Sequence, residues 1–182
     1  MATTDVLRRR TNKSPSALSD LGILILRIGV SATALHAGVI KALNFTTTAQ
    51  FMADGGWRPS TFAAYLVTAT EIAGGLALLL GLLTPLAACG LVAAMLDAWA
   101  ANAAAATVWS DPFNVPFLVA FAATTLLFVG AGAHSVDARV FGRPSWPGVV
   151  TIPLFLVAVA AAVATWVLLN GVNPLHLSTP AG

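Results

Sequence analysis

The chain has 182 residues, of which 58% are hydrophobic and 9% are charged, and its formal net charge is +2. Soluble domains carry about 25% charged residues. The composition therefore excludes a soluble globular protein and, with a mean hydropathy of +0.85, predicts an integral membrane protein. The single cysteine, Cys89, excludes an intramolecular disulfide and a C-x-x-C redox pair. The few basic residues lie mostly beside apolar runs, where membrane topology explains them, so we expect a lipid bilayer as partner and no nucleic acid.

The first apolar run predicts a membrane-spanning helix over residues 19–43. The preceding residues, 1–18, are polar and carry Arg8, Arg9, Arg10 and Lys13. The run is too long for a signal peptide, and no small-residue cleavage site follows it. We therefore expect an uncleaved first span whose basic N-terminal tail stays in the cytoplasm.

This first span carries three titratable side chains. Lys41 lies near its outer end, where the ammonium can reach the lipid headgroups. His36 lies about half a turn away from Arg27 around the helix, and we interpret it as a packing residue rather than a ligand. At about 100° per residue, one face of the helix holds Arg27, Ser31, Ala34, Gly38 and Lys41.

The second apolar run, residues 61–83, carries a carboxylate, Glu71, near its middle. A charge at the middle of a spanning helix costs on the order of 2.5–3.5 kcal/mol. Two interpretations of Glu71 remain open: a structural ion pair that locks two helices, or a proton, quinone or ligand site. Gly74 and Gly75 beside it, and Gly38 on the first span, are positions at which a neighbouring helix can approach closely.

Three further apolar runs predict spans at residues 85–107, 113–129 and 148–170. The first of them carries Asp97 near its middle, and the second has Asn114 in its first turn. The last has no ionisable residue, which is typical of an anchor that faces lipid.

The connecting segments carry turn and interface signals. Residues 44–59 predict an outer loop with a short interfacial helix at 48–53 and with Trp57 in an aromatic belt. Thr84 is expected to cap the third span, with Pro85 at its first helical position.

The basic residues orient the five predicted spans. Segments expected inside hold Arg8, Arg9, Arg10, Lys13, Arg139 and Arg143, whereas those expected outside hold Lys41 and Arg58. We therefore predict an all-α, polytopic transmembrane bundle with its N-terminus in the cytoplasm and its C-terminus outside. It divides into a basic tail (1–18), a four-helix membrane domain (19–143) and an extra span with an outer tail (144–182).

The depths of two charges suggest that they pair. Arg27 lies about 12 Å from the cytoplasmic end of the first span, and Glu71 lies about 18 Å from the same side of the second, at ~1.5 Å per residue. An offset of about 6 Å is within the reach of an arginine side chain. We therefore predict that Arg27 and Glu71 face one another, with His36 or Lys41 as the next candidates for the partner of Glu71.

Three groups of residues, spread in order over residues 20–140, carry a family pattern. They are Leu26-Arg27-Ile28-Gly29 with His36-Ala37-Gly38-Val39-Ile40-Lys41, then Glu71-Ile72-Ala73-Gly74-Gly75 with Gly81-Leu82-Leu83-Thr84-Pro85, then Gly130-x-Gly132-x-x-Ser135-Val136-Asp137. In these motifs the chain resembles the DoxX family of small bacterial integral membrane proteins. It departs from the family pattern at Ala133-His134, where an Arg-Tyr pair is more usual. The resemblance implies a four-helix bundle of DoxX type in the bacterial plasma membrane, with the fifth span outside this core.

The resemblance leaves three functions open. The family takes its name from a subunit of a thiosulfate:quinone oxidoreductase, which implies an accessory or anchoring subunit of a membrane redox complex with membrane or peripheral protein partners. The second hypothesis is an oxidoreductase that binds quinone and passes protons through Glu71. The third is a small transporter or lipid-binding protein with Arg27, Glu71 and Asp97 lining a cavity.

Catalytic residues are not predicted from the sequence, and cofactor signals are few. There is no Cys cluster for an iron–sulfur centre, no paired His at helical spacing for haem and no metal-ligand set. A quinone is the cofactor that the resemblance leaves open.

Overall fold

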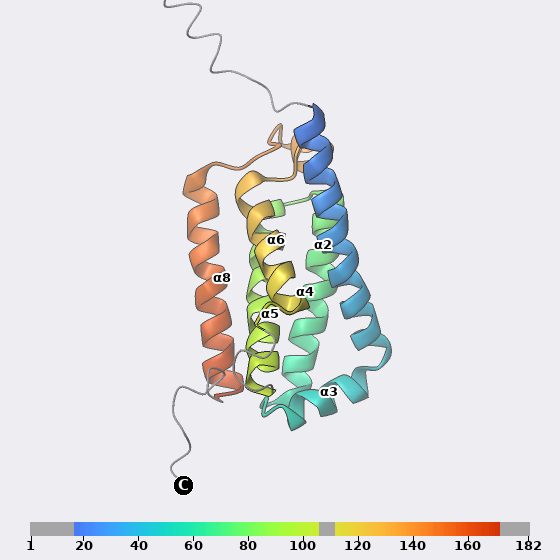
Figure 1. Ribbon diagram of the computed structural model, residues 1–182, viewed down its shortest axis with the longest axis vertical. Helices are drawn as coiled ribbons and strands as arrows, with labels where there is room; N and C mark the ends of the chain where they lie inside the picture. Colours follow the sequence, from blue (N-terminus) through green and yellow to red (C-terminus); the bar gives the residue numbers. More distant parts are fainter. Residues whose placement is uncertain (1–16, 106–111, 172–182) are drawn as a thin grey trace, which may run out of the picture.

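The computed structural model describes residues 17–105 and 112–171. These residues form seven helices and no strand, which confirms the predicted all-α class (Figure 1). The helices are α2 (Ala17–Leu43), α3 (Phe45–Asp54), α4 (Ser60–Leu80), α5 (Thr84–Ala105), α6 (Val115–Val129), α7 (Val136–Val140) and α8 (Gly148–Leu169).

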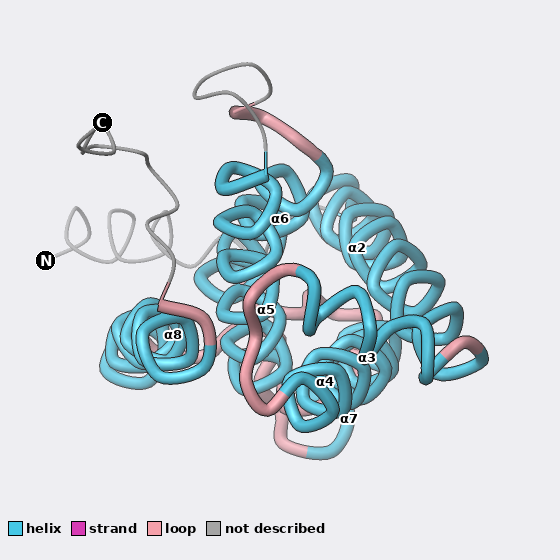
Figure 2. Tube along the Cα trace, turned by 90° about the horizontal axis from the view of Figure 1, so that it is seen from below, coloured by secondary structure: helices cyan, strands magenta, loops and turns pink. Residues whose placement is uncertain are grey.

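Helices α2, α4, α5 and α6 form a bundle, and α8 lies against the outside of α5 (Figure 2). Four helices, α2, α4, α5 and α8, are long and apolar enough to cross a membrane. Helix α6 is apolar but has 15 residues, or about 22 Å at 1.5 Å per residue. The start of α2 and the end of α8 lie at opposite ends of the bundle (Figure 1). The chain is therefore a multi-pass membrane protein with a four-helix core and a further helix outside it.

Glycines set the close approach of α4 to its neighbours. A Cβ on Gly38 of α2 would lie 2.8 Å from Ile72 Cγ1, and one on Gly75 of α4 would lie 2.9 Å from Leu35 Cγ. A Cβ on Gly74 would meet Leu91 of α5 at 2.8 Å. Since real Cβ atoms do not approach this closely, the three glycines permit the packing of α2 on α4 and of α4 on α5.

The turn between α4 and α5 is held by a residue that is far away in the chain. Asp137 accepts hydrogen bonds from the backbone amides of Leu83 (2.7 Å) and Thr84 (2.9 Å), and from Trp146 Nε1 (3.2 Å). The expectation that Thr84 caps this helix is wrong, because its buried hydroxyl has no partner among the described residues. The carboxylate of Asp137 satisfies the first amides of α5 instead.

The opposite end of the bundle is covered by α3. This helix is longer than the predicted 48–53 segment, and none of its residues is buried. Trp57, which follows α3, does not sit in a lipid-facing aromatic belt as predicted: it is buried and packs edge-to-face on Trp166 of α8, with ring centroids 5.3 Å apart. This end of α8 is also tied to the core, since Leu169 O accepts a hydrogen bond from the backbone amide of Arg58.

Candidate functional site in the bundle

A cavity of about 410 Å³ lies between α3, α4, α5 and their neighbours, at the end of the bundle that α3 covers. Its walls are mostly apolar, and its polar lining side chains come from α2, α4, α5 and α8. The polar lining residues are Lys41, Thr70, Glu71, Asp97, Asn102 and Thr165. The apolar lining includes Phe51, Met52, Trp57, Leu66 and Val67.

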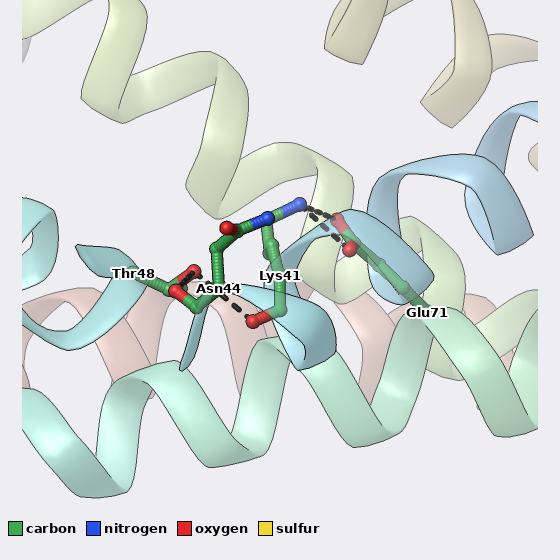
Figure 3. Close-up of polar contacts among 4 residues, drawn as sticks. All are labelled: Lys41, Asn44, Thr48 and Glu71. Atoms are coloured by element: carbon green, nitrogen blue, oxygen red, sulfur yellow. Dashed lines mark hydrogen bonds and ion pairs between the residues drawn. The ribbon is translucent and has the colours of Figure 1, made fainter. Parts of the chain in front are cut away.

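An ion pair between Lys41 and Glu71 forms one side of this cavity (Figure 3). Lys41 Nζ lies 2.8 Å from Glu71 Oε1 and 2.7 Å from Oε2, so the ammonium donates to both carboxylate oxygens. The Glu71 side chain is 2% exposed, whereas that of Lys41 is 27% exposed. The pair thus joins a deeply buried carboxylate to an ammonium that still reaches the cavity.

The backbone around Lys41 is fixed by the turn into α3. Thr48 Oγ1 donates to the carbonyls of Lys41 (3.2 Å) and Asn44 (3.1 Å), and Asn44 Nδ2 donates to Ile40 O at 3.0 Å (Figure 3). These bonds satisfy carbonyls at the end of α2 that have no partner within that helix. They fix the backbone at Lys41, from which the side chain extends to Glu71.

The predicted pairing of Arg27 with Glu71 is wrong. Arg27 is buried, and its guanidinium donates to the backbone carbonyls of Ala131 (2.5 Å) and His134 (2.6 Å) in the loop before α7. The expectation that Lys41 extends to the headgroups is also wrong, because Glu71 binds its ammonium. The predicted face of α2 is confirmed, since Arg27, Ser31, Ala34 and Gly38 are all buried.

Asp97 is the second carboxylate at the cavity. It lies on α5, is partly buried, and has no hydrogen-bond or ion-pair partner among the described residues. A carboxylate left unpaired in apolar surroundings is costly. Its free hydrogen-bonding capacity is therefore a property that a ligand in the cavity can use.

The other predicted site residues do not line this cavity. His36 is exposed on the outer face of α2. Asn114 is the N-cap of α6, where its side chain accepts a hydrogen bond from the amide of Phe117. Arg27 belongs to the loop cluster at the other end, beside Asp20, whose Oδ1 accepts from the amide of Ala133 at 2.9 Å.

Two roles were not predicted from the sequence: that Trp57 lines the cavity, and that Asp137 binds the turn between α4 and α5. Asp137 is fully buried and holds the α4–α5 turn, and the motif Ser135-Val136-Asp137 was the available signal. The described residues include no group of three His, Cys, Asp or Glu side chains that could hold a metal ion.

Comparison with known protein families gives a match over part of the chain. The family model described as DoxX matches residues 22–109. Over these residues the chain is similar to the DoxX family. The matched segment covers α2 from residue 22 onward and α3, α4 and α5, and with them Lys41, Glu71 and Asp97, while α6, α7 and α8 follow it. No curated protein and no solved structure matches the chain.

Proposed function

We propose that this protein binds a lipid-soluble molecule with a hydrogen-bonding headgroup, of the quinone class, in the cavity at Lys41, Glu71 and Asp97. The observation that carries the proposal is an apolar cavity in which an ion pair and an unpaired carboxylate converge. Its volume of about 410 Å³ lies within the range of roughly 300–1,000 Å³ that is usual for small-molecule sites.

The polar groups suit both redox forms of a quinone. The ammonium of Lys41 has three N–H donors, of which two are directed at Glu71, so one remains for a carbonyl oxygen of a ligand. The carboxylate of Asp97 can accept a hydrogen bond from a hydroxyl group, as a quinol would present. Apolar walls with a few convergent polar groups are the usual composition of such a site.

Tryptophan fluorescence tests the proposal, because Trp57 lines the cavity. The full chain in dodecylmaltoside is titrated with decylubiquinone, and we expect saturable quenching that the Trp57→Phe variant largely loses. Asp97→Asn should weaken binding by about tenfold, the effect of ~1.4 kcal/mol from one charge-assisted hydrogen bond.

The matched control for this titration is Asp54→Asn. Asp54 is an exposed carboxylate at the end of α3 that does not line the cavity. We expect it to bind the probe as the wild type does. Quenching that does not saturate, or that is equal in the Trp57→Phe variant, would contradict the proposal.

The role of an accessory or anchoring subunit stays a prediction from the family resemblance. A quinone site is compatible with that role, since a redox partner could draw on the same bound molecule. Purification from the native host with mild detergent, followed by identification of co-purifying proteins, tests it. The transporter hypothesis assumed that Arg27 lines the cavity, and Arg27 does not.

A further inference from the structure

We infer that a groove between α4 and α5 holds the hydrocarbon chain of the molecule whose headgroup enters the cavity, so that the ligand is an amphiphile with an extended chain. The inference rests on the proposed function and specifies the ligand that this site accepts. It adds a second subsite, outside the polar cavity, with its own residues and its own test.

The groove is a hollow of about 310 Å³ along the contact between the two helices. Apart from Thr70, its lining is apolar and mostly small: Ala73, Gly74, Ala77, Leu82, Leu83, Leu86, Ala87 and Gly90. No charged side chain lines it. Such a surface has few hydrogen-bonding groups for a polar ligand, but it can make dispersion contacts with a hydrocarbon chain.

The groove meets the cavity at Thr70 and Gly90, which line both hollows. A Cβ on Gly90 would have one neighbour within 4 Å, Thr70 Cγ2 at 3.5 Å, so the space around this glycine is open. Gly74 is different, because a Cβ there would clash with Leu91. Gly74 thus serves helix packing, whereas the missing side chain of Gly90 keeps the two hollows connected.

The direction and length of the path favour a chain. From Asp97 in the cavity to Leu86 in the groove is 11 residues of α5, or about 16 Å at 1.5 Å per residue. That is roughly half of the ~30 Å hydrocarbon core of a bilayer. The path also runs along the helix axes, as lipid chains do, and ends at Leu86, which is 56% exposed. A headgroup in the cavity therefore has a route for its chain toward lipid.

A small-residue groove could alternatively receive a helix of a second copy. The shared walls at Thr70 and Gly90 favour the chain of the ligand, because a packed helix would not need a connection to a polar cavity. The test is designed so that these two occupants give different results.

The test compares two probes that differ in the chain alone: 2,3-dimethoxy-5-methyl-1,4-benzoquinone, which is the bare headgroup, and decylubiquinone. Two variants fill the groove. Gly90→Leu places a side chain at the junction, and Ala73→Leu adds bulk at an exposed groove residue that does not line the cavity. Two controls accompany them: Gly90→Ala, whose methyl makes an ordinary contact, and Ala32→Leu, on the exposed face of α2.

We expect both groove-filling variants to raise the Kd of decylubiquinone by about tenfold or more, the lower end of what apolar steric misfit produces. The bare headgroup should bind Ala73→Leu and Ala32→Leu within about twofold of the wild type, because neither residue lines the cavity. Comparing variants at one detergent concentration removes the partition of the probes into micelles. Because Ala73 is exposed, Ala73→Leu keeps the test valid if Gly90→Leu does not fold.

Three outcomes would overturn the inference or its basis. Unchanged affinity for decylubiquinone in both groove-filling variants, with normal binding of the bare headgroup, would overturn the groove subsite and leave the cavity site standing. A change of oligomeric mass in Ala73→Leu, with unchanged probe binding, would assign the groove to a second copy. Failure of both probes to bind the wild type would instead overturn the proposed function.

Discussion

The two partners of the Lys41–Glu71 pair should differ in what their removal costs. Lys41→Met leaves the Glu71 carboxylate 2% exposed with no other donor among the described residues. Glu71→Leu leaves an ammonium whose side chain is 27% exposed and lies at the end of α2. The long lysine stem can turn its charge toward water or headgroups, which the buried carboxylate cannot do.

The structure gives a magnitude for each change. Removing one partner of a buried pair costs ~3–5 kcal/mol when the other stays uncompensated, and we expect the lower end, about 3 kcal/mol, for Lys41→Met because the pair borders a cavity. Glu71→Leu should cost about 1 kcal/mol, the range of a partly exposed pair. The double variant should lie within about 1 kcal/mol of the wild type, since replacing both partners by apolar groups is often neutral.

Reversible unfolding in mixed dodecylmaltoside–SDS micelles, followed by far-ultraviolet circular dichroism, measures these differences. A gap of about 2 kcal/mol between the single variants is a factor of roughly thirty in the unfolding equilibrium constant. Arg58→Met is the matched control, because Arg58 is an exposed basic residue outside the pair. Equal costs for the two single variants, or a double variant as unstable as the sum of the singles, would refute the reasoning.

Three further predictions concern Arg27 and Asp137, at the end of the bundle opposite α3, and the membrane topology. Arg27→Leu should lower the free energy of unfolding by ~3 kcal/mol, because the carbonyls of buried Ala131 and of His134 lose charge-assisted bonds. Adding Glu71→Leu should not recover this loss in the same unfolding assay. Asp137→Ala should cost about 1–2 kcal/mol through loss of the α5 cap, measured as a lower midpoint in that assay; no change would remove Asp137 from the turn. Reporters fused after Arg143 and Gly182 should be active on opposite sides of the membrane, and activity on one side would contradict the topology.

The buried face of α2 could be predicted from the sequence, but the partners of that face could not. Helical periodicity depends on the sequence of one helix, and it placed Arg27 and Gly38 on the inner face as the structure does. The register between α2 and α4 depends on contacts of single atoms. Gly38 against Ile72, and Leu35 against Gly75, set a register in which Arg27 lies beside Gly81.

That register explains why the predicted Arg27–Glu71 pair does not form. Gly81 lies ten residues after Glu71, or about 15 Å along the axis at 1.5 Å per residue. Counting depth from the helix ends assumes that the two ends are level, but Arg27, ten residues into α2, lies beside Gly81, which follows the last residue of α4. The carbonyls that bind Arg27 come from a loop more than 100 residues later in the chain. Because these acceptors belong to the backbone, no pattern of side chains in the sequence predicts them.

The cavity could not be predicted from the sequence, because part of its wall comes from α3 and the segment after it. Phe51, Met52 and Trp57 line it from α3 and the segment after it, and these residues were predicted to lie at the lipid interface. Asp97 and Glu71 were each recognised as intramembrane carboxylates, but their common cavity depends on how α4 packs on α5. Small residues such as Gly90 and Ala94 leave that space open because their side chains are absent or short, and a motif search does not detect this.

The two ends of the bundle differ in how their charges are used, and this difference indicates where the function lies. At the end of the bundle where residues 130–137 lie, the charged side chains of Arg27, Asp20 and Asp137 form hydrogen bonds with backbone groups that would otherwise be unpaired. At the α3 end, Glu71 is paired, while Asp97, which lines the same mostly apolar cavity, has no partner among the described residues. A charge without a structural bond is costly in a membrane. The unpaired Asp97 at the α3 end is therefore the feature that supports the proposed ligand site over a purely structural role for this cavity.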